Sequence, residues 1–410
     1  MKLLQVVWNF PDTVMRPFDM YYFYWPMQEA RLRGWDAEVL TFQVNSQQPV
    51  EEFIDGIHIR RCPAGQRKGR PFSWPFMHAL LTTDADIIHC HGYAEGRSEL
   101  AILLARLRGR PVIFTPHFHV YPKRRPLREL YDRTVGRFFF NMSSRVIVFT
   151  HYTCQQLIAL GVRPQKLCIV PHVVRPDVFH ETDAEHEPGQ LLLQAGVTGS
   201  PLILGVGQLI ERKGWEFTVR CLPMIVTRFP EAKLLIIGPS QPAEPVFRQR
   251  LMALAAELGV SEHIQILQDN TPAFILDAYR SATILTHPSF VESFGMVLLE
   301  AMIAKLPVVA HNGTGMPCIV DDQASGFVVD VRDTEAYTQA LLALLSDAQL
   351  RQRMGEEAWH QALSRYNQQE IAAQLFAIYA EVTSTPGDLL RPPEVRPPIG
   401  TTVVHSAKHE

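Results

Sequence analysis

The sequence has little cysteine and lacks the paired spacing that binds zinc or forms a redox motif. Six cysteines are scattered over 410 residues, and no two of them form a C-x-x-C pair. A chain of this length can bury a large core, so it needs neither disulfides nor a structural metal to fold. We therefore expect reduced cysteines and a cytoplasmic protein.

The sequence also lacks a strong net charge and a long hydrophobic run. It contains 39 basic and 42 acidic side chains, a net charge of −3, which argues against a nucleic-acid partner. No apolar run approaches the roughly 18 residues that a membrane-spanning helix needs. The expectation is a globular protein that is soluble or is attached only to the surface of a membrane.

Two motifs that bind cofactors or metals are missing as well. The segment Leu204–Trp215 has the glycines of a strand–turn–helix, but Ile210 stands where a dinucleotide fingerprint needs glycine, which disfavours a dehydrogenase. Two His-x-His pairs begin at His89 and His117, but no carboxylate or cysteine completes either pair at the spacing of a metal motif. This disfavours a metal site and leaves structural roles open for His89, His91 and His119.

What the sequence does contain is an alternation of short apolar runs and amphipathic segments, repeated twice. We expect strands at 2–9, 37–42, 57–60, 86–90, 111–115, 145–149, 167–170, 202–206, 233–237, 264–267, 282–286, 307–310 and 326–329. We expect helices at 97–108, 127–140, 214–228, 246–258, 293–305, 348–364 and 367–382. Strands that alternate with helices predict an α/β protein with two doubly wound, parallel-sheet, Rossmann-like domains facing across a cleft.

The predicted domain boundaries follow from local composition. An acidic segment with Pro-Gly at 180–190 separates a first domain, 1–180, from a second domain, 190–365. The proline-rich tail 384–410 is predicted to be disordered. Because ligands of parallel sheets bind beyond the carboxyl ends of the strands, the cleft between the domains is the expected site.

The most informative motif is an apolar helix that contains a carboxylate. Glu292 and Glu300 are separated by seven residues, and Glu300 lies in a run that is apolar on nearly every face. Such a helix is buried, and a buried carboxylate needs a polar partner. Ser293 is predicted to cap the helix, and Gly295 allows a phosphate or diphosphate to approach its N-terminus. The alternative is an ordinary helix in which Glu300 pairs with a buried arginine.

Two more segments place polar residues after strands. Gly207, Gln208 and Lys213 follow the strand at 202–206, where Lys213 would neutralise a phosphate; an ordinary strand–turn–helix is the alternative. His117 follows the strand at 111–115, where it would transfer a proton or donate a hydrogen bond to a sugar or phosphate.

Basic residues gather in the first half of the chain. They lie in the run Pro122–Arg128 and at Arg67, Lys68 and Arg70. Such a cluster is typical of a solvated face, and it also suits an anionic lipid or an acidic acceptor.

Together these segments resemble the retaining glycosyltransferases of family 4, which have the GT-B fold. The resemblance covers most of residues 1–382. It rests on Glu292 and Glu300 with Phe294-Gly295, on Gly207-Gln-Leu…Lys213-Gly, on Pro171–Phe179, on the glycine loop Asn312–Pro317 and on Ala30–Val39. Two departures stand out: Gln208 replaces the arginine that binds phosphate in the family, and Asn9–Phe18 replaces the glycine-rich loop.

The resemblance implies a role for each matched residue. Glu292 would bind hydroxyls of the donor sugar, Glu300 the ribose, and Lys213 a phosphate, while His117 would line the reaction centre. Backbone N–H groups at the start of the helix would face the sugar-diphosphate. The implied catalytic residues are His117 and Glu292. The implied donor-binding residues are Gly207, Gln208, Lys213, Ser293, Phe294, Gly295, Met296, Val297 and Glu300. No cofactor and no essential metal is implied, and the helix at 367–382 would cross back onto the first domain.

The function implied by the resemblance is transfer of a sugar from a nucleotide-sugar to an acceptor hydroxyl, with retention. The acceptor would be a sugar, a lipid-linked molecule or a polysaccharide, in polysaccharide, lipopolysaccharide or glycolipid synthesis, with peripheral attachment to the inner face of the membrane as a further expectation. Two alternatives stay open: a relative that binds a sugar-nucleotide without catalysis, and a GT-B-fold sugar-nucleotide epimerase.

Overall fold

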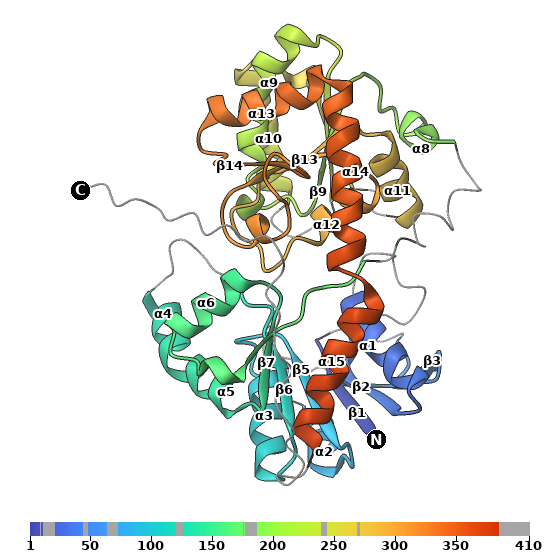
Figure 1. Cartoon of the computed structure of the whole chain (residues 1–410), viewed down its shortest axis with the longest axis vertical. Helices are drawn as coiled ribbons and strands as arrows, with labels where there is room; N and C mark the ends of the chain where they lie inside the picture. The colour runs from blue at the N-terminus through green and yellow to red at the C-terminus, as the bar shows by residue number, and fades with distance from the viewer. Residues whose placement is uncertain are drawn as a thin grey trace.

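The computed structural model shows two α/β units, one above the other along the long axis of the molecule (Figure 1). It describes residues 1–8, 10, 21–43, 48–63, 73–119, 126–174, 176, 187–238, 244–268 and 271–384. Several sequence predictions lie outside these residues: the tail from 385 onward, most of the segment 9–18, the basic residues at 67–70 and 122–125, and most of the acidic segment 180–190.

The first sheet has eight strands in the order β3-β4-β2-β1-β5-β6-β7-β8. Its strands are β1 Lys2–Val6, β2 Asp36–Gln43, β3 Glu51–Ile54, β4 Ile57–Pro63, β5 Ile87–His91, β6 Val112–Thr115, β7 Arg145–Val148 and β8 Leu167–Ile169. Neighbouring strands are parallel except for β3, which runs antiparallel to β4 at the edge. The strand order reverses between β1 and β5, which lie side by side.

The second sheet has six parallel strands in the order β11-β10-β9-β12-β13-β14. Its strands are β9 Leu202–Val206, β10 Lys233–Ile237, β11 Ile264–Leu267, β12 Ile284–His287, β13 Val308–His311 and β14 Gly326–Val329. Every residue of the central strands β9 and β12 is buried, as expected for a sheet covered on both faces. The strand order reverses between β9 and β12, which makes this pair the switch point of the sheet.

Helices flank both sheets (Figure 1). Their bounds are α1 Tyr21–Leu32, α2 Trp74–Thr82, α3 Arg97–Leu107, α4 Pro126–Tyr131, α5 Arg137–Met142, α6 His151–Ala159, α8 Gln190–Gln194, α9 Trp215–Arg228, α10 Glu244–Glu257, α11 Pro272–Ser281, α12 Met296–Ile303, α13 Thr334–Ser346, α14 Ala348–Arg365 and α15 Gln368–Thr383. A π-helical turn, Asp132–Gly136, joins α4 to α5. The predicted fold class, two doubly wound α/β units, is confirmed.

The last helix, α15, packs on the first unit, whereas α14 before it packs on the second (Figure 1). The ring of Phe376 lies 5.0 Å from that of Trp35, between centroids. The hydroxyl of Tyr379 is 2.7 Å from Nδ1 of His89, in the middle of β5. The chain therefore passes between the two units twice, while the predicted domain boundaries of 1–180 and 190–365 stay predictions.

Two details of the predicted strands are wrong. The predicted strand at 2–9 ends at Val6, and the side chain of Trp8 is 43% exposed. Strand β3 was not predicted, because it has no buried face: Phe53, its largest side chain, is mostly exposed. Hydrophobic periodicity cannot detect a strand that packs no apolar face.

Candidate functional site

The helix predicted at 293–305 begins later than expected. Helix α12 starts at Met296, and its N-cap is Gly295, which has a φ of 113°. No side chain caps the helix, so the prediction that Ser293 is the N-cap is wrong. The chain turns through a left-handed conformation that glycine adopts without strain, and Ser293 lies two residues before this turn. The first backbone N–H groups of α12 therefore have no side-chain cap.

Glu300 lies just over one turn into α12 and is buried. Its Oε2 accepts a hydrogen bond of 2.6 Å from the hydroxyl of Tyr279, a buried residue of α11. Burial and the neighbouring carboxylate raise the pKa of Tyr279 well above its usual value, so its proton stays in place. A buried tyrosine is thus one partner of Glu300. A carboxylate has about four acceptor positions, so Glu300 can bind further hydroxyl groups.

Glu292 lies in a cluster of cationic and polar side chains. Its Oε1 is 2.5 Å from Nζ of Lys213, 3.4 Å from Nε2 of His287 and 3.9 Å from Nη1 of Arg212. Burial opposes its ionisation, but Lys213, His287 and Arg212 together bring the pKa of Glu292 well below its usual value. The site therefore holds a buried, ionised carboxylate beside two cations.

Gly207 makes room for the ammonium group of Lys213. It has a φ of 148°, and a Cβ at this position would lie 3.2 Å from Cε of Lys213. Any larger residue would be strained and would push Lys213 away from Glu292. The backbone carbonyl of the next residue, Gln208, accepts a 2.9 Å hydrogen bond from Nε1 of Trp215, which fixes the turn.

Arg212 places a guanidinium beside Gln208. The family that this chain resembles has an arginine at the position of Gln208. Nη2 of Arg212 donates to Oε1 of Gln208 at 3.4 Å, and Nη1 donates to the carbonyl of Val291 at 3.0 Å. Both residues come from the loop after β9. The charge missing at Gln208 is therefore present four residues later in the chain.

All of these groups meet at the switch point of the second sheet. Gln208 and Lys213 follow β9, and His287 ends β12, the strand hydrogen-bonded to β9. Strands that diverge from a switch point leave a crevice at their carboxyl ends, which is where ligands of doubly wound sheets bind. Nδ1 of the buried His287 has no hydrogen-bond partner among the described residues, and its Nε2 faces Glu292 at 3.4 Å.

The first unit contributes histidines from the ends of β5 and β6. Nε2 of Gln5 is 3.0 Å from Nε2 of His91, and Nδ1 of His91 is 3.3 Å from Nε2 of His117. An amide nitrogen can only donate, so His91 accepts at Nε2 and donates at Nδ1. His117 then accepts at Nε2, and its proton resides on Nδ1.

Burial keeps His117 neutral. It lowers the pKa of His117 to about 3, with His119 and Arg97 acting in the same direction. A histidine with this pKa is not protonated at neutral pH, which favours hydrogen bonding over general acid catalysis among the roles considered from the sequence. No group of three or more His, Cys, Asp or Glu side chains in the described part of the chain converges as metal ligands do.

The two units approach each other at these residues. His117 and Ser293 border the same small space, together with Phe149. The ring of Phe294 lies 5.0 Å from that of His172, and Arg212 and Glu292 are close enough to His119 to influence its pKa. The structure thus brings His117, Glu292, Ser293 and Phe294 to one region between the units.

The contact made by Tyr279 was not predicted from the sequence. This residue comes from α11 and reaches Glu300 only because α11 and α12 flank the same sheet. The loop Asn312–Pro317 is also nearer to the first unit than its sequence indicates. A Cβ on Gly315 would lie 3.1 Å from Cγ2 of Thr150.

Comparison with protein families gives two matches. The model described as Glycosyl transferases group 1 matches residues 194–361, and the model described as Glycosyl transferase 4-like domain matches residues 22–172. Both glutamates and Lys213 lie within the first match, and His117 lies within the second.

Matches to two relatives cover most of the chain. This chain is 30% identical over 307 residues to D-inositol 3-phosphate glycosyltransferase of Corynebacterium jeikeium (strain K411), and the match covers 72% of each protein. It is 28% identical over 354 residues to the protein of the same name from Nocardia farcinica (strain IFM 10152), covering 80% of this chain and 77% of that relative.

Solved structures with low sequence identity share the fold. An alpha,alpha-trehalose-phosphate synthase (UDP-forming) from Burkholderia vietnamiensis superposes with a TM-score of 0.77 at 16% identity, covering 93% of this chain and 97% of the other. Anabaena HepE in complex with UDP and glucose gives a TM-score of 0.75 at 17% identity, covering 93% and 100%. These matches, with the switch-point site and both family models, lead to one assignment. The chain belongs to the glycosyl transferases group 1, a family of retaining, nucleotide-sugar-dependent glycosyltransferases with the GT-B fold.

Proposed function

We propose that the protein transfers a hexose from a UDP-sugar bound at the start of α12 to an acceptor hydroxyl held by the first unit. The observation that carries the proposal is the buried, ionised Glu292 beside Lys213 and Arg212 at the ends of β9 and β12. Support for UDP comes from the structural match to Anabaena HepE, which was solved with UDP, with UDP and glucose, and with UDP-glucose.

The donor would extend along the switch point. Glu300 accepts hydrogen bonds from the ribose, and the first N–H groups of α12 meet the diphosphate, which a helix N-terminus favours. Lys213 has three N–H donors, so an ammonium that contacts Glu292 can also contact a phosphate oxygen. Glu292 then accepts hydrogen bonds from hydroxyls of the hexose.

Catalysis in this arrangement is mainly positioning and charge stabilisation. As the acceptor oxygen bonds to the anomeric carbon, the bond from that carbon to the diphosphate breaks, and the acceptor's proton passes to the departing phosphate oxygen. Lys213 and Arg212 stabilise the negative charge that the diphosphate gains. Neutral His117 donates a hydrogen bond from Nδ1 toward the sugar. Glu292, which its partner cations keep ionised, accepts hydrogen bonds from the hexose.

The acceptor is proposed as a hydroxyl of a sugar, a lipid-linked molecule or a polysaccharide, in polysaccharide, lipopolysaccharide or glycolipid synthesis. A second candidate is a small phosphorylated polyol, because the matching relatives are named D-inositol 3-phosphate glycosyltransferases. Incubation with UDP-hexoses and each acceptor class separates these candidates. Conversion of the UDP-sugar without any acceptor would instead indicate an epimerase, and binding without product a non-catalytic relative.

Replacing Glu292 with alanine should lower turnover by roughly 10- to 100-fold, the value of one or two hydrogen bonds to a charged group. UDP affinity should change less, because Glu292 is proposed to contact the sugar and not the nucleotide. Initial rates of UDP release and a UDP titration measure the two effects. Glu292→Gln is the matched control for shape; wild-type rates in Glu292→Ala would refute the role of this residue.

A further inference from the structure

One helical face of the first unit is apolar and uncovered in this chain. Helix α4, the π-helical turn and α5 form a nearly continuous helix from 126 to 142. Its inner face buries Asp132, Gly136 and Phe140. Its outer face carries exposed apolar side chains, which are 41% to 82% exposed: Leu127, Leu130, Val135 and Phe138. In Figure 1, α4 and α5 lie at the left edge of the first unit, and α15 lies to their right.

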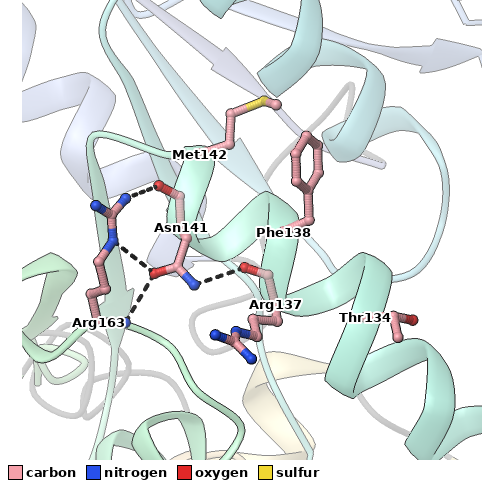
Figure 2. Close-up of a pocket in the computed structure, with 6 residues that line it drawn as sticks. All are labelled: Thr134, Arg137, Phe138, Asn141, Met142 and Arg163. Carbon is pink, nitrogen blue, oxygen red and sulfur yellow. Dashed lines mark hydrogen bonds between the residues drawn. The ribbon is translucent and has the colours of Figure 1, made fainter.

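A surface hollow of about 560 Å³ opens on the same face. It is lined by Thr134, Arg137, Phe138, Asn141, Met142 and Arg163. Figure 2 shows the apolar side chains of Phe138 and Met142 beside a cluster of polar contacts. In that cluster Arg163 is held by Asn141: Nη2 donates to the Asn141 carbonyl at 2.8 Å, and Nε donates to its Oδ1 at 3.2 Å. The hollow thus combines an apolar wall with a guanidinium that is already ordered.

Positive charge is concentrated around the hollow. Arg137 and Arg163 line it, and Lys166 lies close by in the chain. Burial lowers the pKa of Lys166, and Arg163, Arg145 and Arg106 lower it further, so these cations are near one another. Among them Arg145 has an ion pair with Glu381, but no acidic residue lines the hollow itself. An apolar surface next to excess positive charge is complementary to an anionic bilayer.

We propose that the α4–α5 face docks on an anionic phospholipid bilayer, with Leu127, Leu130 and Phe138 at the boundary of the acyl chains and Arg137 and Arg163 on lipid phosphates. The outward apolar residues recur along one side of the helix, as in helices that lie in the plane of a membrane surface. The structure contains no membrane-spanning helix in its described residues, so attachment would be through this surface. The inference stands apart from the proposed transfer reaction, because docking needs neither donor nor acceptor.

Vesicle co-sedimentation of the full-length protein tests the proposal without any substrate. Vesicles of equal parts phosphatidylcholine and phosphatidylglycerol should bind the protein at low salt, and vesicles of phosphatidylcholine alone should bind it much more weakly. The double variant Arg137→Glu, Arg163→Glu should weaken binding by about tenfold or more, given the attraction of each basic residue to an anionic surface. High salt should have the same effect.

A second double variant, Leu127→Asp, Phe138→Asp, tests the apolar contribution. Phe53→Asp is its control, because Phe53 is an exposed aromatic residue of the same unit, on β3. Thermal melting should be unchanged in both aspartate variants, since these side chains are exposed. A melt of Arg137→Glu, Arg163→Glu checks that the protein stays folded without the Arg163–Asn141 hydrogen bonds. Absence of binding to the anionic vesicles, or wild-type binding by both double variants, would overturn the proposal. A dimer in light scattering that Leu127→Asp, Phe138→Asp converts to a monomer would also overturn it, in favour of contact between two copies.

Discussion

Replacing Lys213 with alanine should slow sugar transfer by roughly 100- to 1,000-fold, as loss of a preorganised group that stabilises transition-state charge does in other enzymes. Lys213 is 8% exposed, and its ammonium lies 2.5 Å from Glu292. The variant removes the cation expected to meet the leaving diphosphate. It also leaves Glu292 with the more distant Arg212 and a histidine, so the sugar contact is disturbed as well.

Lys305→Ala is the matched control for this experiment. Lys305 also forms an ion pair with a glutamate, Glu356, at 2.9 Å, but this pair is exposed. Exposed pairs contribute about 0–1 kcal/mol, so this variant should keep both its stability and its rate. Initial rates at saturating UDP-sugar distinguish the two variants. A Lys213→Ala protein that stays folded and transfers sugar at the wild-type rate would remove Lys213 from the mechanism.

Acidification should destabilise the protein strongly well before its carboxylates protonate. Burial lowers the pKa of His89 and His117 to about 3 each, and lowers those of His91 and His172 well below their usual value. In the unfolded chain each histidine titrates near pH 6.5. Below that pH the unfolded state therefore binds more protons than the folded state, and stability falls as pH falls.

The expected size of this effect is large. Below about pH 6.5, each of the four histidines lowers the free energy of unfolding by about 1.4 kcal/mol per pH unit. A drop from about pH 7.5 to about 5.5 therefore lowers the free energy of unfolding by about 5 kcal/mol in all. Glu292 does not add to the loss in this window. Its lowered pKa gives stability that is present above its unfolded pKa of about 4.3 and is lost only as pH falls through the lower folded value.

Denaturant unfolding across this pH range measures the effect, and a pair of histidine variants isolates its cause. His89→Gln should reduce the slope of the unfolding free energy against pH by the amount that corresponds to about one proton, because one buried imidazole no longer takes up a proton on unfolding. His151→Gln, at an exposed position, is the control for the substitution itself. Equal slopes in wild type and His89→Gln would show that the buried histidines do not cause the acid sensitivity.

Much of the fold was predictable because it depends on local patterns. The central strands of both sheets are short apolar runs, and such runs were assigned correctly wherever both faces are buried. Strand β3 escaped prediction because its side chains, including Phe53, are not buried on either face. The start of α12 was misplaced because a serine in the sequence is a common N-cap, whereas the chain uses the backbone freedom of Gly295.

The site was predictable in composition but not in its contacts. Glu292 and Lys213 are far apart in the chain and meet only because β9 and β12 are adjacent in the sheet. Strand order depends on how helices pack, which no local pattern encodes. The contact of Tyr279 with Glu300 is of the same kind, and so is the position of Arg212 beside Gln208.

Titration of UDP into the wild type and into Glu300→Ala tests the central claim most directly, since it asks whether the buried carboxylate of α12 holds the nucleotide. Loss of its hydrogen bonds to the ribose should weaken UDP binding by roughly 10- to 100-fold. Glu300→Gln, which keeps the shape and the contact with Tyr279, should fall between the two. Equal UDP affinity in the wild type and in a folded Glu300→Ala protein would contradict the account.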